Sequence, residues 1–439
     1  MNQNHGTSRR PVCDCDRLSS REMSVKLSLF IFVLLLMINT AAEAKAEKID
    51  DYHWTGVDRV VVIGDIHGDY DQYIRVMESA GLLNRRGRWS GGETHLVQTG
   101  DIPSRGDDTR KIVDHLVRVA RQAERAGGYV HMLIGNHEAM NVVGDLRYKT
   151  PGEFAAFETR NSARLQDMQW QRQVEWMSSN DPAFAEIDLE TYRKEWEKTV
   201  PRGWVEHRQA WALTGEYGEW VKGNPVALRV NDSLFLHGGI SAKYCKFSLE
   251  SLTEQVIAAM EHFDPTVESI LYDELGPLWY RGMARENETE IYGQTLDNIL
   301  ERYGVKRIVV GHSPTGGAVW PRFDQRVIVN DTGIGAYFGS HIGILELTAD
   351  GATAIYGDTR IPLPEKNTDR AEYLKAVIEA DSNSARLEAR VARMLAPSVV
   401  ATGNLDGGPR FVTRDEGIQA EQAEPPEKTT VVSETGTCQ

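Results

Sequence analysis

VVVIGDIHG, residues 60–68, places an apolar run directly before a glycine and two polar side chains, Asp65 and His67. An apolar run of this length followed by a turn residue is typical of a strand. The glycine permits a tight turn and a close approach of the backbone to a ligand, because it has no Cβ atom. The stretch therefore predicts a strand whose carboxyl end presents a carboxylate and an imidazole.

Two later segments repeat this arrangement. The apolar segments His95–Gln98 and Tyr129–Ile134 are also followed by glycine and then by Asp101 or Asn136. Between them, apolar residues recur at helical spacing, which predicts an amphipathic helix over Asp107–Ala126. The alternation of strands and helices indicates an α/β sheet, and such sheets collect ligands at the carboxyl ends of their strands.

The rest of the chain divides into recognisable parts. Residues 151–223 predict a helical insertion whose six tryptophans pack it onto the main domain, with a lid over the site as the alternative. The main domain is expected to span 47–365, with its globular part ending near Leu363. A helix within Thr368–Met394 and a disordered acidic tail from Asp415 to Gln439 follow. The other expected elements are strands at Val226–Val230, Leu234–Leu236 and Arg307–Val310, short strands near Val327, Ile344 and Ala354, and a helix at Ile291–Tyr303.

The net charge of the 439-residue chain is −15. This charge opposes the phosphate neutralisation on which general nucleic-acid binding depends, so nucleic acid is not an expected partner. A local basic pocket for one phosphate remains compatible with an acidic surface.

The N-terminus resembles an export signal. The apolar run Leu27–Ile38 is too short to span a bilayer as a helix, and A-x-A patterns follow it at residues 42–46. We expect residues 1–46 to comprise an N-terminal extension and a signal peptide that starts at Met23, and the mature protein to be periplasmic or secreted without a stable membrane span. The mature chain then keeps two cysteines, Cys245 and Cys438, for which two free thiols are expected and one bridge is the alternative.

Five short motifs carry donor side chains. The predicted metal ligands in them are Asp65, His67, Asp101, Asn136, His237 and His312. Mixed oxygen and imidazole donors suit Mn, Fe and Zn better than Mg or Ca. A shared carboxylate such as Asp101 can bridge two divalent ions, and such a pair can clamp the oxygens of a displacement at phosphorus. The five motifs are 64-GDIHG-68, 100-GDIPSRG-106, 135-GNHE-138, 237-HGG-239 and 311-GHS-313.

This order of motifs resembles the phosphoprotein phosphatases within the calcineurin-like metallophosphoesterases. The resemblance covers residues 58–356, and 276-GPLWYRG-282 is similar to the Shewanella-like protein phosphatase branch. It implies an α/β fold with a central β-sandwich flanked by helices, two bound metals, and hydrolysis of phosphorylated proteins or small phosphomonoesters. It also implies that a hydroxide activated by both metals attacks phosphorus, that His137 is the proton donor, and that Arg105 and Arg281 bind the phosphate beside Asn136.

The chain departs from the family pattern at Ser104, where the family has an aspartate that orients the catalytic histidine. Asp107 or Asp108 is the candidate substitute for that aspartate. The eukaryotic S-A-P-N-Y element is also missing, and residues 330–333 (NDTG) stand near its place. Two alternative functions stay open from the sequence: a hydrolase of diadenosine tetraphosphate or another nucleotide, and a non-catalytic metal-binding scaffold.

Overall fold

The computed structural model describes residues 1–2, 46–381, 385–395 and 438. The chain divides into the units Met1–Lys45 and Ala46–Gln439, and only the second is described in detail here. The predicted export signal and almost all of the predicted acidic tail lie outside the described residues. In the part that is described, no helix combines the length and hydropathy that crossing a bilayer requires.

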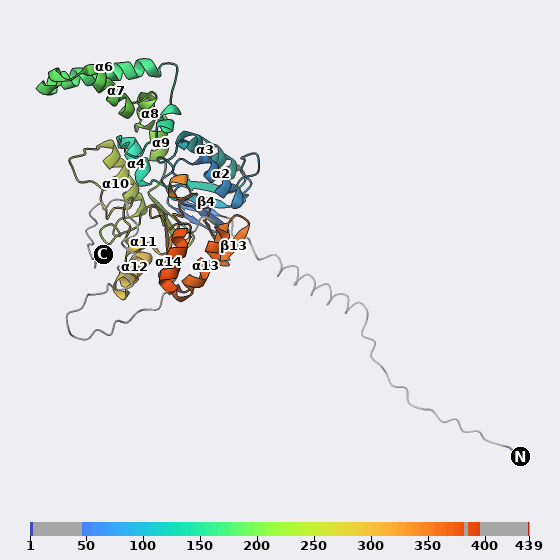
Figure 1. Ribbon diagram of the computed structural model, residues 1–439. Coiled ribbons are helices and arrows are strands. Elements are labelled where there is room, and N and C mark those ends of the chain that lie inside the picture. The colour runs from blue at the N-terminus through green and yellow to red at the C-terminus, as the bar shows by residue number, and fades with distance from the viewer. Residues whose placement is uncertain (3–45, 382–384, 396–437, 439) are drawn as a thin grey trace, which may run out of the picture. The chain divides into compact units, whose positions relative to one another are not determined.

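The described unit is a mixed α/β structure (Figure 1). Its strands are β1 (Glu47–Asp50), β2 (His53–Thr55), β3 (Arg59–Ile63), β4 (His95–Gln98), β5 (Tyr129–Met132), β6 (Ala227–Val230), β7 (Ser233–Leu236), β8 (Arg307–Val310), β9 (Trp320–Arg322), β10 (Val327–Val329), β11 (Ile344–Thr348), β12 (Gly351–Tyr356) and β13 (Thr359–Pro362). Its α-helices are α2 (Tyr70–Ser79), α3 (Thr109–Arg125), α4 (Asn136–Val143), α5 (Pro151–Ala155), α6 (Ser162–Asn180), α7 (Leu189–Thr199), α8 (Trp204–Trp211), α9 (Glu216–Lys222), α10 (Leu249–Glu261), α11 (Gly282–Arg285), α12 (Glu290–Tyr303), α13 (Arg370–Ala380) and α14 (Ala385–Leu395). Short 3-10 helices lie at η1 (Pro182–Glu186), η2 (Ala336–Phe338) and η3 (Asn367–Asp369).

The strands form two sheets that share one hydrophobic core. One sheet has the order β1-β2-β6-β7-β8-β10-β9, and the other has the order β13-β12-β11-β3-β4-β5. Strands β3, β4 and β5 are parallel neighbours in the second sheet, and β7 and β8 are parallel neighbours in the first. The carboxyl ends of these five strands are the places where the five motifs begin. The predicted two-sheet α/β fold is thereby confirmed.

Most of the predicted elements are present with small shifts at their ends. The strand expected over Tyr129–Ile134 stops at Met132, and the helix expected over Asp107–Ala126 is α3. The tight connection at Asn231 and Asp232 joins β6 to β7, and Asn231 takes the left-handed φ of 54° that such a turn requires. Four short strands at or next to the sheet edges were not predicted, because three or four residues give too little pattern to separate them from loops. These are β1, β2, β9 and β13.

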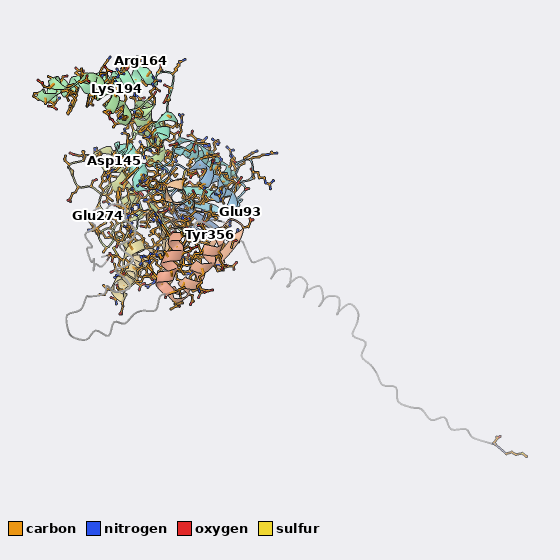
Figure 2. The ribbon with its side chains drawn as sticks, viewed as in Figure 1. Glu93, Asp145, Arg164, Lys194, Glu274 and Tyr356 are labelled. Atoms are coloured by element: carbon orange, nitrogen blue, oxygen red, sulfur yellow. A yellow bond between two sulfur atoms is a disulfide. The ribbon has the colours of Figure 1, made fainter. Side chains whose placement is uncertain are left out.

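The insertion is helical, as predicted, but its tryptophans do not all serve one purpose. Trp211 is completely buried against the core, whereas Trp170 on α6 and Trp196 on α7 contact each other with ring centroids 5.2 Å apart. Trp176 is 60% exposed. Helices α6 and α7 run side by side and carry solvent-facing charges such as Arg164 and Lys194 (Figure 2). The expectation that the tryptophans pack the insertion onto the main domain is therefore correct for only some of them.

Packing continues beyond Leu363, where the sequence placed the end of the globular part. Helix α13 buries Leu374 and Val377 completely, and its Tyr373 donates a hydrogen bond to the carbonyl of Val319 at 2.7 Å. Helix α14 contacts α13 and buries Leu387. The helix expected within Thr368–Met394 is thus two helices, and both belong to the packed structure.

Cys245 and Cys438 are bonded to each other, so the expectation of two free thiols is wrong. Cys245 lies nine residues after the last residue of β7 and is completely buried, and its Sγ is bonded to that of Cys438. No pattern around Cys438 predicts a contact with the core, because the neighbouring residues have the polar composition of an unstructured tail. The bond ties the C-terminus to the loop that follows β7.

Reduction of this disulfide is expected to lower the free energy of unfolding by about 2–4 kcal/mol, because the bond closes a long loop and restricts the unfolded chain. The bonded residues are 193 positions apart. Urea denaturation with and without dithiothreitol measures the effect, and Cys438→Ser is the control that should not respond to the reductant. Equal midpoints for the natural chain under both conditions would contradict the expectation.

Candidate metal centre and active site

The five motifs meet where the two sheets end. The loops after β3 and β4 are joined by backbone hydrogen bonds from Ile66 and His67 to the carbonyl of Asp101, at 3.0 and 3.1 Å. The loops after β7 and β8 are joined by the Gly311 N–H, which donates to the carbonyl of His237 at 2.8 Å. Across the sheets, the His312 N–H donates to the Asp65 carboxylate at 3.1 Å. Backbone contacts therefore fix the distances between side chains that are up to 247 residues apart.

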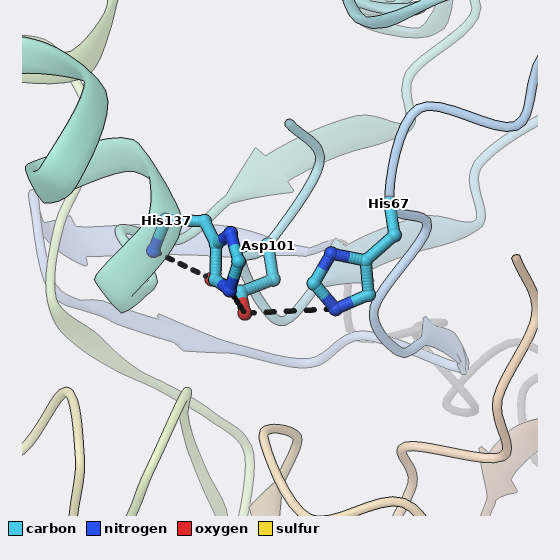
Figure 3. A group of neighbouring side chains, drawn as sticks. All are labelled: His67, Asp101 and His137. Carbon is cyan, nitrogen blue, oxygen red and sulfur yellow. Dashed lines mark hydrogen bonds and ion pairs between the residues drawn. The ribbon is translucent and has the colours of Figure 1, made fainter. Parts of the chain in front are cut away.

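Asp101 stands at the centre of the cluster (Figure 3). Its Oδ2 lies 3.8 Å from His67 Nε2 and 3.7 Å from His137 Nε2, and its Oδ1 lies 3.4 Å from His237 Nε2. The Oδ1 atom also accepts the backbone N–H of His137 at 2.9 Å. A carboxylate in this position can supply one oxygen to each of two neighbouring groups.

The first group contains Asp65, His67 and Asp101. His67 donates from Nδ1 to the carbonyl of Pro103 at 3.3 Å, which leaves Nε2 as the atom with a lone pair. That nitrogen is 3.9 Å from Asp65 Oδ2. Donor atoms of His67, Asp101 and His137 also lie within 4.8 Å of one another, so His137 borders this group.

The second group contains Asn136, His237 and His312 together with Asp101. His237 donates from Nδ1 to the carbonyl of Thr99 at 2.9 Å, and this bond turns Nε2 toward the cluster. That Nε2 atom is 2.9 Å from Asn136 Oδ1 and 3.1 Å from His312 Nδ1. A carbonyl that holds one ring nitrogen of a histidine is the usual support for a metal ligand on the other.

The charges of the cluster fit a cation. Burial and the neighbouring Asp331 and Asp101 carboxylates raise the pKa of Asp65 well above its usual range. Burial lowers the pKa of His67 to about 4, and burial also lowers the pKa of His312, so both rings are neutral near pH 7. Neutral imidazoles and crowded carboxylates are the species that bind divalent metals. The donor set present therefore fits a site for divalent ions.

Several of these residues hold a left-handed backbone that side chains rarely adopt. The φ angles are 51° at His67, 58° at Asp101, 69° at Arg105 and 63° at His312. Each such conformation costs on the order of 1 kcal/mol and persists where the surrounding structure holds it, most often at functional sites. These four residues lie in the loops that carry the cluster and the Arg105 edge beside it.

Gly135 leaves the space that the Asp101 carboxylate fills. A Cβ atom at this position would lie 2.4 Å from Asp101 Oδ1 and 2.8 Å from Glu138 Oε2. Gly135→Ala is therefore expected to displace the carboxylate and to lower kcat/KM roughly 100-fold, a loss typical of a misplaced reacting group. Metal content and activity should be measured together. Gly293→Ala in α12 is the matched control, because a Cβ there meets only Arg326 Nη2 at 3.6 Å, and it should leave both quantities unchanged.

Helix α4 begins at the site and presents Asn136 and His137 from its first turn. Glu138 fixes this turn, since its carboxylate accepts N–H groups from Gly135 at 2.8 Å and from Asp101 and Ile102 at 2.9 Å each. Burial and the Asp101 charge raise the pKa of Glu138 to about 7. Glu138 was not singled out from the sequence, although its place in the GNHE motif is the signal by which it could have been found.

The two predicted phosphate-binding arginines lie at different edges of the cluster. Arg281 donates from Nη1 to the carbonyl of His312 and to Ser313 Oγ, the latter at 3.3 Å. The Arg105 guanidinium lies over the rings of Tyr148 and Tyr337, with its Cζ atom 4.0 and 4.4 Å from the ring centroids. Neither Tyr148 nor Tyr337 is predicted from the sequence, because nothing in their local sequence distinguishes them from surface tyrosines.

The two aspartates considered as substitutes at Ser104 do not serve in that way. Asp107 accepts a hydrogen bond from Thr150 Oγ1 at 2.5 Å, and Asp108 lies 4.0 Å from Lys111. His137 Nδ1 is buried without a hydrogen-bond partner among the described residues. In place of the missing S-A-P-N-Y element, the NDTG segment supplies Asp331, a completely enclosed carboxylate whose pKa is raised by burial to about 7.

Comparison with known proteins agrees with this architecture. The family model described as calcineurin-like phosphoesterase matches residues 58–316. The chain is 28% identical over 324 residues to Shewanella-like protein phosphatase 2 of Arabidopsis thaliana, covering 71% of this chain and 80% of that one. It is 29% identical over 303 residues to an uncharacterized protein of Schizosaccharomyces pombe, covering 67% and 79%.

A solved structure is also similar. The crystal structure of the cold-active protein-tyrosine phosphatase of a psychrophilic Shewanella species is 27% identical in sequence and superposes with a TM-score of 0.54, covering 74% of this chain and 85% of that chain. The resemblance drawn from the motifs is thereby confirmed. The chain belongs to the calcineurin-like phosphoesterases, a family of metal-dependent hydrolases of phosphate esters.

Proposed function

We propose that the chain is an exported protein phosphatase that holds two divalent ions, drawn from Mn, Fe and Zn, and hydrolyses phosphomonoesters. The observation that carries this proposal is the convergence of donors from five strand ends on Asp101, with an arginine at each of two edges. The predicted ligands are Asp65, His67 and Asp101 for one ion, and Asp101, Asn136, His237 and His312 for the other. Bound ions supply the charge that activates water and neutralises the phosphate.

The chain's own residues supply the remaining steps. Arg105 and Arg281 bind and orient the phosphate, because the planar guanidinium donates paired hydrogen bonds to its oxygens. His137 carries the proton to the leaving oxygen. Burial lowers the pKa of His137 to about 3, and a bound phosphate dianion raises it again by adding negative charge beside the ring. The ring would therefore take up a proton from solvent when the substrate binds and pass it to the leaving oxygen.

Two observations support a protein substrate and export. The names of the Arabidopsis relative and of the solved Shewanella structure describe protein phosphatases, and the latter is a protein-tyrosine phosphatase. Phosphotyrosine peptides are therefore the first substrates to test. The Cys245–Cys438 disulfide is typical of proteins in oxidising compartments, which agrees with the predicted export signal.

A nucleotide substrate is less well supported. An adenine clamp would need free aromatic faces, and the tryptophans of the insertion offer few. Trp211 is completely buried, and Trp170 and Trp196 pack on each other. Among the described residues, no observation favours a non-catalytic metal-binding scaffold.

The test uses the mature form that begins near Lys45, loaded in turn with Mn, Fe and Zn, with metal content measured on each sample. Release of phosphate from phosphotyrosine, phosphoserine and phosphothreonine peptides is compared with turnover of diadenosine tetraphosphate. We expect kcat/KM for the best phosphopeptide to exceed that for the dinucleotide roughly 100-fold. The opposite ranking would assign the protein to nucleotide hydrolysis.

A further inference from the structure

His137 is held differently from the histidine of the family pattern. The family places a carboxylate at the position of Ser104, whose hydroxyl here receives a hydrogen bond from Asn141 Nδ2 at 3.5 Å. The same Asn141 nitrogen donates to the backbone carbonyl of His137 at 2.7 Å and so fixes its backbone. His137 Nδ1 is buried with no hydrogen-bond partner in the described part of the chain. The ring must therefore be oriented by packing.

Tyr148 supplies that packing. Its ring stacks on the His137 ring with centroids 5.1 Å apart and an interplanar angle of 28°. The His67 ring stands nearly perpendicular to the His137 ring, with centroids 4.8 Å apart and an interplanar angle of 75°. An imidazole between a stacked ring and an edge-on ring has little freedom to rotate, because aromatic pairs prefer defined geometries.

The same tyrosine also holds Arg105. Its carbonyl accepts the Arg105 N–H at 3.0 Å, in the left-handed stretch that carries this arginine. Its ring lies 4.0 Å from the guanidinium carbon, a distance at which cation–π attraction operates. Tyr148 reaches this place because α4 ends at Gly144, whose φ of 91° turns the chain back toward the site.

We propose that Tyr148 is the positioning residue of the active site, orienting the proton donor His137 and the phosphate-binding Arg105 with one ring, in the role that a carboxylate at position 104 fills in the family pattern. The role is defined for the reaction proposed above, so the inference rests on that function. A stacked ring orients the imidazole without adding charge to it. The direct contacts with substrate belong to His137 and Arg105, and Tyr148 acts through them.

Tyr337 offers a matched comparison. Its ring lies 4.4 Å from the Arg105 guanidinium carbon, as a second cover on that side chain, and it is 60% exposed. Among the described residues, its ring contacts include Phe338 but not His137. Removal of the Tyr337 ring should therefore weaken phosphate binding by Arg105 without affecting proton transfer by His137.

The test compares kcat and KM of the metal-loaded protein for phenyl phosphate, whose leaving group needs a proton, and para-nitrophenyl phosphate, whose leaving group needs it much less. Tyr148→Leu is expected to lower kcat for phenyl phosphate roughly 10- to 100-fold and kcat for the nitrophenyl ester less than about 3-fold. Tyr148→Phe should stay near the natural protein, because it keeps the ring. Tyr337→Leu should raise KM for both esters alike. Thermal midpoints and metal content are measured on every variant.

Two variants that place a carboxylate at position 104 test the role of Tyr148 independently. Ser104→Asp in the Tyr148→Leu background should restore at least about 5-fold of the lost kcat for phenyl phosphate, since it returns a carboxylate to the family position. Ser104→Asp alone should change that kcat less than about 3-fold, because the ring is already held. A large gain from Ser104→Asp alone would overturn the inference even if Tyr148→Leu does not fold.

The inference would also be overturned if Tyr148→Leu lowered kcat equally for both esters. A decrease of kcat for phenyl phosphate in Tyr148→Phe as large as that in Tyr148→Leu would overturn it as well. These results leave the proposed function intact, since the natural protein still hydrolyses the esters. If the natural metal-loaded protein hydrolyses neither ester, the proposed function fails and the inference fails with it.

Discussion

His137→Ala is expected to lower kcat for phenyl phosphate by roughly 10²- to 10⁴-fold, the range that a positioned proton donor contributes. The side chain is buried at the start of α4, and its Nε2 lies 3.7 Å from Asp101 Oδ2, beside the carboxylate at the centre of the cluster. Removing it leaves the six predicted ligands in place. Metal content should therefore stay at the level of the natural protein.

Steady-state kinetics with esters of graded leaving groups measure this effect. The deficit should shrink toward unity with 2,4-dinitrophenyl phosphate, whose leaving group departs without a proton. That ester is the internal control for folding and metal loading in the same preparation. A deficit of equal size across the series would show that His137 has a role other than proton donation.

Asp101→Asn is expected to produce the largest loss, with turnover falling below detection and bound metal falling from about two ions to fewer than about one per chain. Its two oxygens point to the two groups of donors, and a neutral amide cannot compensate two divalent charges. Burial opposes the charged form of Asp101, but the neighbouring histidines, including the hydrogen-bonded His237 whose own pKa is raised, hold the pKa of Asp101 well below its usual range. Asparagine keeps an oxygen to accept the His137 N–H, and so the turn can remain.

Elemental analysis after remetallation, paired with kinetics, measures this result. Asp114→Asn is the matched control, since Asp114 is a carboxylate on α3 that accepts a hydrogen bond from Tyr217 at 2.8 Å and is not among the predicted ligands. It should keep both metal and activity. Retention of two ions in Asp101→Asn would contradict the bridging role.

The C-terminal segment and the helical insertion are held by contacts between residues that are far apart in the sequence. Cys438 sits in a segment with the composition of an unstructured tail, yet it is bonded to the buried Cys245. Helices α13 and α14 continue the packed structure after Leu363, where the local pattern weakens. Trp170 and Trp196 were expected to contact the main domain and instead contact each other. Composition describes one segment at a time, and these outcomes depend on which partner each segment meets.

The sequence alone determined the strands that begin the motifs, the helical nature of the insertion and the candidate ligands, because hydrophobic periodicity and donor chemistry are local properties. It also marked Ser104 as a departure. Only the tertiary structure decided what accompanies it: Asp107 turns to Thr150, while Tyr148 stacks on His137 and Arg105. The left-handed turns at Asp101 and Arg105 and the path of the chain after Gly144 bring these side chains together. Orientation between distant loops is set by packing, which no local pattern encodes.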